Sequence, residues 1–109
     1  MSNKKLINST KIFISTQPFG QINSKPIDIL NKQNLKFIIN PFNRKCTEKE
    51  LRKYLKDTEI LIAGTDRISK STLDLSPNLK LIARVGVGLD GIDLNYAKKK
   101  GIKISYTPL

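Results

Sequence analysis

Short apolar runs recur along the chain, and each is followed by polar or turn-forming residues. Five of these runs are four to seven residues long and rich in Ile, Leu, Val, Phe or Tyr: residues 11–16, 35–39, 60–63, 79–85 and 102–106. Most of them are continuously apolar rather than alternating, which is typical of strands buried on both faces of a parallel sheet. The pattern therefore predicts five parallel strands.

The polar segments between the runs predict four helices. The strongest signal is the capping box of Thr47 and Glu50, in which each side chain accepts a hydrogen bond from the backbone amide of the other residue. Asp93 is placed to cap a later helix, and Gly101 is placed to end that helix in a left-handed conformation. The four helices are expected to begin near Ser24, Thr47, Ser69 and Asp93.

Strands that alternate with helices indicate an α/β fold with helices on both faces of the sheet. Right-handed crossovers leave few topologies, and at this length we expect a flavodoxin-like open sheet of order 2-1-3-4-5 in one domain, residues 1–109. Ligands of such a sheet gather beyond the carboxyl ends of the strands. Those ends carry residues 16–20, 40–43, 64–67, 85–90 and 106–109.

A glycine motif follows the fourth run. Gly86, Gly88 and Gly91 spell G-x-G-x-x-G, the pattern of a dinucleotide-binding turn. Such a site also needs an acidic residue about 20 positions further on, at the end of the next strand, to hold the ribose hydroxyls. That strand ends at Tyr106-Thr107-Pro108, without a carboxylate. We therefore expect the turn to hold a small anion through its amides. The alternatives are a stand-alone dinucleotide-binding module and a turn in which the glycines only permit a positive φ.

The chain is strongly basic, with 20 Lys and Arg against 9 Asp and Glu and a formal net charge of +11. A basic domain raises nucleic-acid binding as a possible function. The lysines are scattered through every segment, however, and no aromatic residues are interleaved with them as a base-stacking platform requires. A nucleic-acid-binding domain therefore ranks third, after the anion-binding turn and the stand-alone dinucleotide module.

Compartment signals point to the cytoplasm. No apolar stretch approaches the roughly 18 residues of a spanning helix, and the first residues lack the apolar region of a signal peptide. Cys46 is the single cysteine, so it forms no disulfide within the chain, and we expect a spectator thiol. A phosphorylation receiver domain has a similar strand pattern but needs an acidic pair after strand one, where this chain has Thr16-Gln17-Pro18.

Part of the sequence resembles a known family. Residues 63–69, 77–90, 92–94 and 100–108 are similar to the D-isomer-specific 2-hydroxyacid dehydrogenases, particularly the phosphoglycerate dehydrogenase-like members. The resemblance implies the substrate-binding domain of an NAD(P)-dependent oxidoreductase, a homodimer acting on a small 2-hydroxy or 2-keto acid. It also implies that the NAD-binding Rossmann domain lies downstream and that later residues complete this domain, which would cover the exposed face of strand five. We expect residues 1–109 to be an incomplete domain.

The resemblance assigns roles by position. Val87 and Gly88 would offer backbone amides to the substrate carboxylate, Arg84 would brace the strand end nearby, and Gly64 and Thr65 would form the opposite wall. The family's catalytic histidine, its carboxylate partner and a separate arginine lie beyond these residues, and this chain has no histidine. We therefore assign no catalytic, cofactor-binding or metal-binding residue here, and expect the piece alone to be inactive.

Some positions leave alternatives open. Arg84 is equally suited to a structural pair with Asp90 or Asp93, and we expect Asp66 and Arg67 to lie on a solvated loop. Many family members carry asparagine in place of Gly91, so glycine is expected to loosen this turn. Phosphoglycerate-specific members often carry arginine in place of Ala63, and alanine cannot reach a phosphate. The sequence therefore does not identify the acid.

Overall fold

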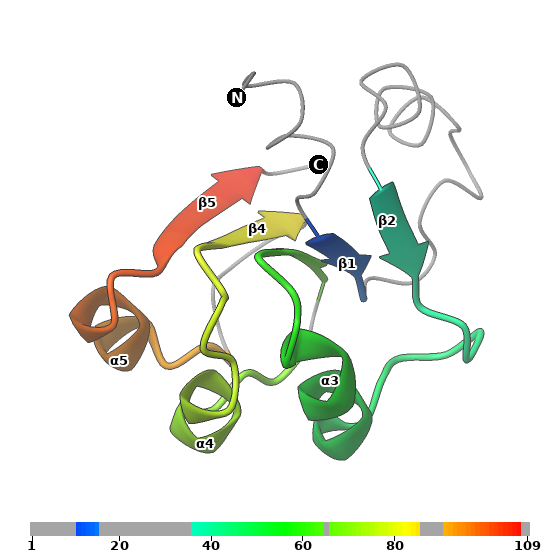
Figure 1. Cartoon of the computed structure of the whole chain (residues 1–109), viewed down its shortest axis with the longest axis horizontal. Coiled ribbons are helices and arrows are strands. Elements are labelled where there is room, and N and C mark those ends of the chain that lie inside the picture. Colours follow the sequence, from blue (N-terminus) through cyan, green and yellow to red (C-terminus); the bar gives the residue numbers. More distant parts are fainter. Residues whose placement is uncertain (1–10, 16–35, 65, 86–90, 108–109) are drawn as a thin grey trace.

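A computed structural model describes residues 11–15, 36–64, 66–85 and 91–107. Its centre is a parallel sheet with strand order β2-β1-β3-β4-β5, which confirms the predicted order (Figure 1). The strands are β1 (Lys11–Ile14), β2 (Lys36–Ile39), β3 (Ile60–Ala63), β4 (Leu81–Val85) and β5 (Lys103–Thr107).

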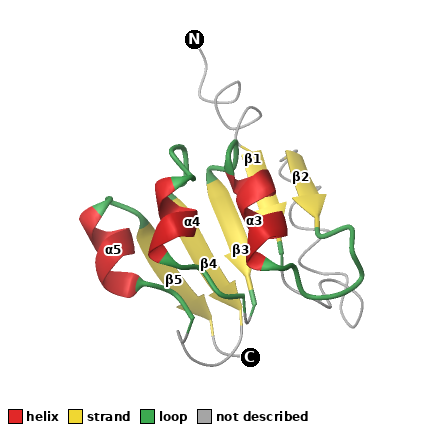
Figure 2. Ribbon diagram, turned by 90° about the horizontal axis from the view of Figure 1, so that it is seen from below, coloured by secondary structure: helices red, strands yellow, loops and turns green. Residues whose placement is uncertain are grey.

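The three described helices all lie on one face of the sheet (Figure 2). They are α3 (Glu48–Leu55), α4 (Lys70–Asp74) and α5 (Leu94–Lys99). After β2 the chain moves across the sheet in one direction, from β3 to β4 to β5, and right-handed crossovers then place the connecting helices on the same side. The helix expected near Ser24, which would cover the other face, lies outside the described residues.

Local signals set the helix boundaries as predicted. The Glu50 amide donates to Thr47 Oγ1 at 3.2 Å and the Thr47 amide donates to Glu50 Oε1 at 2.9 Å, so the capping box is confirmed. The Asp93 side chain accepts from the Tyr96 amide at 3.1 Å and begins α5. Gly101 follows α5 with a φ of +79°, the left-handed conformation expected of it.

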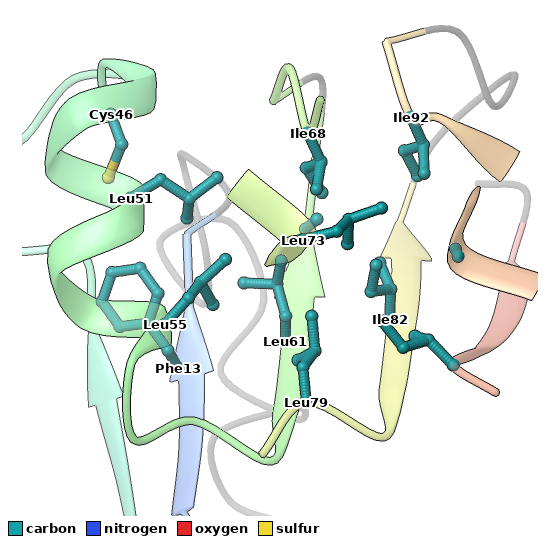
Figure 3. Close-up of a cluster of buried hydrophobic side chains, with 13 residues drawn as sticks. Phe13, Cys46, Leu51, Leu55, Leu61, Ile68, Leu73, Leu79, Ile82 and Ile92 are labelled. Carbon is teal, nitrogen blue, oxygen red and sulfur yellow. The ribbon is translucent and has the colours of Figure 1, made fainter. Parts of the chain in front are cut away.

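The core lies between the sheet and this helix layer. Phe13, Leu61 and Ile82 are register partners on three adjacent strands, and each is at most 1% exposed. Leu51 and Leu55 of α3 point toward this row (Figure 3). The row fixes the three strands relative to one another, and therefore also fixes where their carboxyl ends lie.

Glu48 links two helices. It stands at the start of α3, and its Oε1 accepts from the Ser69 amide at 2.9 Å, from Thr72 Oγ1 at 2.9 Å and from Ser69 Oγ. These hydrogen bonds, led by that of the Ser69 hydroxyl, lower the pKa of Glu48. A carboxylate from one helix therefore accepts from the backbone amide of Ser69, the N-cap residue of the next helix, and from two hydroxyl groups in its first turn.

Replacing Glu48 with glutamine is expected to lower the free energy of unfolding by about 1–2 kcal/mol at pH 7, because charged hydrogen bonds become neutral ones. The folded-state pKa is lowered, so this stabilisation is present above the ordinary value of 4.5 and is lost as pH falls through the folded-state pKa. Urea unfolding at several pH values should show a smaller acid-induced loss in Glu48→Gln than in the wild type.

Glu59→Gln is the matched control for this prediction. Glu59 pairs with Lys80 at 3.5 Å, and the Lys80 side chain is 76% exposed. Exposed ion pairs contribute little, so this variant should unfold almost as the wild type does at every pH. Equal effects of the two substitutions would show that Glu48 does not tie α3 to α4.

Candidate functional site

Three residues form a row across the carboxyl ends of β1, β3 and β4. The Ser15 amide donates to the Ile62 carbonyl at 2.9 Å and so extends the ladder beyond β1, while Ala63 and Arg84 are register partners. Side chains alternate along strands, so Ser15, Ala63 and Arg84 face the same side as the core row before them, the side of the helices. This row, in which Ser15 and Arg84 are polar, therefore closes the core at the edge where ligands of such sheets bind.

Asp66 is buried in this edge. It is 2% exposed, and its Oδ2 accepts from Ser15 Oγ at 2.7 Å and from the Gly64 amide at 3.2 Å. Its Oδ1 is buried and has no hydrogen-bond partner in the described part of the chain. The expectation of a solvated loop is therefore wrong for Asp66, because the loop after β3 turns its carboxylate back to the end of β1. Arg67 is exposed, as expected.

Asn40 joins the end of β2 to the same network. It is 4% exposed, its Nδ2 donates to the Ser15 carbonyl at 3.0 Å and to the Arg44 carbonyl at 2.8 Å, and its Oδ1 accepts from the Phe42 amide at 2.8 Å. Buried amides and carboxylates are costly without such bonds, so the network holds three strand ends in one arrangement.

Sequence reasoning missed this network, although strand-end positions indicated the edge at which it lies. Ser15, Asn40 and Asp66 each lie at or shortly beyond the end of an apolar strand, and the carboxyl ends of parallel strands meet at one edge. Two of the three fall inside the strand-end segments expected to gather ligands.

Arg84 is the cation of this edge. It lies in β4, one residue before the strand ends, and is 4% exposed. Asp66 and Arg84 are the two charged residues that are buried among those the structure describes. Of its two expected structural partners, Asp93 caps α5, and Asp90 lies outside the described residues.

The other predicted site residues are placed as follows. Gly64 is buried, and its amide is already donated to Asp66, so it can shape a wall but does not offer that amide to a ligand. Thr65, Val87 and Gly88 lie outside the described residues, and their roles stay predictions.

Gly91, the third glycine of the G-x-G-x-x-G pattern, has a packing role. Its φ is +91°, its carbonyl accepts from the Ile68 amide at 2.7 Å, and a Cβ there would lie 3.2 Å from the Asp66 carbonyl oxygen. The Ile68 carbonyl in turn accepts from the Asp93 amide at 3.0 Å. Gly91 and Asp93 are thus hydrogen-bonded to Ile68 in the loop after β3. Residues 86–90 lie outside the described residues, so the looseness expected of the turn stays a prediction.

The described residues do not fit a dinucleotide site. A pyrophosphate at the start of α5 would meet the carboxylate of Asp93, which already caps this six-residue helix. The next strand, β5, spans Lys103–Thr107 and carries no acidic residue for a ribose. Both observations favour the interpretation that the glycine pattern is accidental.

The surroundings of Cys46 disfavour its thiolate form. It is 7% exposed, and burial, together with the nearby charges of Asp66 and Glu50, raises its pKa to about 11. Thiolates rather than thiols react, so it behaves as the expected spectator. Within the described ranges, no group of three His, Cys, Asp or Glu could hold a metal ion, and no helix is long and apolar enough to cross a membrane.

Known proteins resemble this chain in sequence and in fold. It is 33% identical over 87 residues to a hydroxypyruvate reductase of Thermotoga maritima, covering 74% of this chain and 28% of that protein. It is 36% identical over 64 residues to a D-3-phosphoglycerate dehydrogenase of Methanocaldococcus jannaschii, covering 57% and 12% of the two chains. The crystal structure of the TT0316 protein of Thermus thermophilus is 29% identical, with a TM-score of 0.76, covering 91% of this chain and 30% of that one.

The chain thus spans less than a third of the length of these relatives. The family model described as "D-isomer specific 2-hydroxyacid dehydrogenase, catalytic domain" matches residues 12–109, nearly the whole sequence. The chain therefore belongs to the D-isomer specific 2-hydroxyacid dehydrogenase family.

Proposed function

We propose that this chain is the substrate-binding part of an NAD(P)-dependent D-2-hydroxyacid dehydrogenase whose cofactor domain is formed by other residues of the protein. The observation that carries the proposal is the buried guanidinium of Arg84 near the carboxyl end of β4, two positions before Gly86 in the sequence. A buried cation at this edge suits a small carboxylate ligand.

The chain's own contribution is to bind and orient the acid. Val87 and Gly88 would donate their amides to the substrate carboxylate, Arg84 would hold the strand end beside it, and Gly64 and Thr65 would shape the facing wall. Each charge-assisted hydrogen bond is worth about 1.5–3 kcal/mol, enough to fix a small acid in one orientation. A bound nicotinamide would supply hydride exchange at the 2-carbon. The residues named above include no histidine and would supply no proton acceptor for that exchange.

The remaining assignments follow from the same proposal. The substrate is a small 2-hydroxy or 2-keto acid, the cofactor is NAD or NADP, and the whole protein is a cytoplasmic homodimer that binds neither nucleic acid nor membranes. Asp66 Oδ1 supports a ligand site at this edge, since it is buried without a hydrogen-bond partner among the described residues, and such an atom calls for an explanation.

Calorimetric titration of residues 1–109 with NAD tests whether the cofactor is bound by other residues of the protein. No binding is expected up to millimolar cofactor, because the described residues offer neither an anion-binding helix start nor a ribose carboxylate. The protein translated from the complete reading frame should bind NAD or NADP and reduce a 2-keto acid. Tight, stoichiometric binding by residues 1–109 would instead establish the stand-alone dinucleotide module.

A further inference from the structure

We infer that Asp66 makes the substrate site selective for singly charged, unphosphorylated 2-keto and 2-hydroxy acids. The inference rests on the proposed function and names the substrate class of the same site. It starts from the position of a buried carboxylate within the wall that Gly64 and Thr65 are proposed to form.

The carboxylate is built into the edge. Asp66 is 2% exposed, and Oδ2 is held by the Ser15 hydroxyl at 2.7 Å and by the Gly64 amide at 3.2 Å. The two bonds come from different strand ends and leave the group little freedom. The negative charge is therefore a fixed part of the wall. The Gly64 amide, which also belongs to the wall, already donates its hydrogen bond to Asp66.

The second carboxylate oxygen, Asp66 Oδ1, disfavours a phosphate group nearby because both are hydrogen-bond acceptors. Asp66 Oδ1 is buried without a hydrogen-bond partner among the described residues, so it can accept one more hydrogen bond. A hydroxyl group can donate to it, whereas a phosphate dianion and a carboxylate present acceptors only. An acceptor brought against this oxygen would leave both groups unsatisfied in a water-poor edge.

The charge count points the same way. Arg84 and Asp66 are the buried charges that the structure describes, and they sum to zero. One substrate carboxylate brings the sum to −1, and a phosphate ester would add a further charge of about −1.5 to −2 at pH 7. Each unit of negative charge brought near Asp66 is therefore disfavoured by like-charge repulsion, less strongly at greater distance or where water enters.

Steady-state rates with the complete protein test the selectivity. Hydroxypyruvate and its phosphate ester are compared as substrates with NADH and with NADPH. We expect kcat/KM to favour hydroxypyruvate by at least about tenfold in the wild type. Asp66→Asn keeps the size of the side chain, removes the charge and can place an amide donor where Oδ1 stands. This variant should reduce the preference by roughly tenfold or more.

Asp57→Asn is the matched control, because it removes the same charge from an exposed residue beyond the C-terminal end of α3. It should leave the ratio of the two kcat/KM values unchanged. Equal or better use of the phosphate ester by the wild type would overturn the inference, and so would an unchanged ratio in Asp66→Asn. The wild-type ratio tests the selectivity itself even where the variant does not fold. If the complete protein turns over neither compound and no other 2-keto acid, the proposed function itself is overturned.

Discussion

Replacing Phe13 with alanine is expected to lower the free energy of unfolding of the chain by about 3–5 kcal/mol. Phe13 is 1% exposed, is the register partner of Leu61 in the central strand, and stacks on Tyr54 of α3 with ring centroids 4.5 Å apart. Truncation would leave a cavity between sheet and helix and would also remove the ring pair. A loss of this size is a large fraction of the stability of a small domain.

Ile38→Ala provides the control for Phe13→Ala. Ile38 is the register partner of Phe13 on the neighbouring edge strand β2, yet it is 55% exposed. The same kind of truncation there should cost less than about 1 kcal/mol. Both variants are compared with the wild type by urea unfolding monitored by circular dichroism. Similar losses at the two positions would contradict the described placement of α3, which packs over β1 and not over β2.

The second large effect is expected at Gly91, where alanine should destabilise the chain by about 2–3 kcal/mol. The φ of +91° is unfavourable for any residue with a Cβ, and here the Cβ would also lie 3.2 Å from the Asp66 carbonyl oxygen and 3.6 Å from Arg67 Cα. Relief of that contact requires the loop after β3 to move, and this loop carries the buried carboxylate.

Gly101→Ala separates backbone strain from crowding. Gly101 has a similar φ of +79°, but a Cβ there would meet nothing within 4 Å. Its replacement should therefore cost only the left-handed conformation, about 1 kcal/mol. Thermal unfolding of the two variants would reveal the difference, and an equal loss at both glycines would mean that the turn at Gly91 yields without disturbing Asp66.

Much of the fold follows from local signals in the sequence. The capping box of Thr47 and Glu50, the cap at Asp93 and the left-handed Gly101 each depend on residues within four positions of one another, so their chemistry can be read along the chain. Continuously apolar strands and right-handed crossovers then leave one favoured sheet order. Strand ends shifted by one or two residues, because pairing in three dimensions rather than composition decides where a strand stops.

The candidate site was less predictable because its contacts are distant in sequence. Ser15 and Asp66 are 51 positions apart, and nothing near either residue indicates that a loop aspartate will be buried. A carboxylate between threonine and arginine has the composition of a solvated loop, and only the return of the loop to the end of β1 reverses that expectation. Strand-end positions indicated the correct edge, whereas the hydrogen-bond partners required the structure.

The buried thiol of Cys46 has one practical consequence. With a pKa of about 11, roughly one molecule in ten thousand carries the thiolate at pH 7. Alkylating reagents and mild oxidants therefore reach this sulfur mainly when the packing between α3 and the sheet opens. The chain's single cysteine thus records transient opening of that layer, and its labelling rate can be followed without introducing a probe.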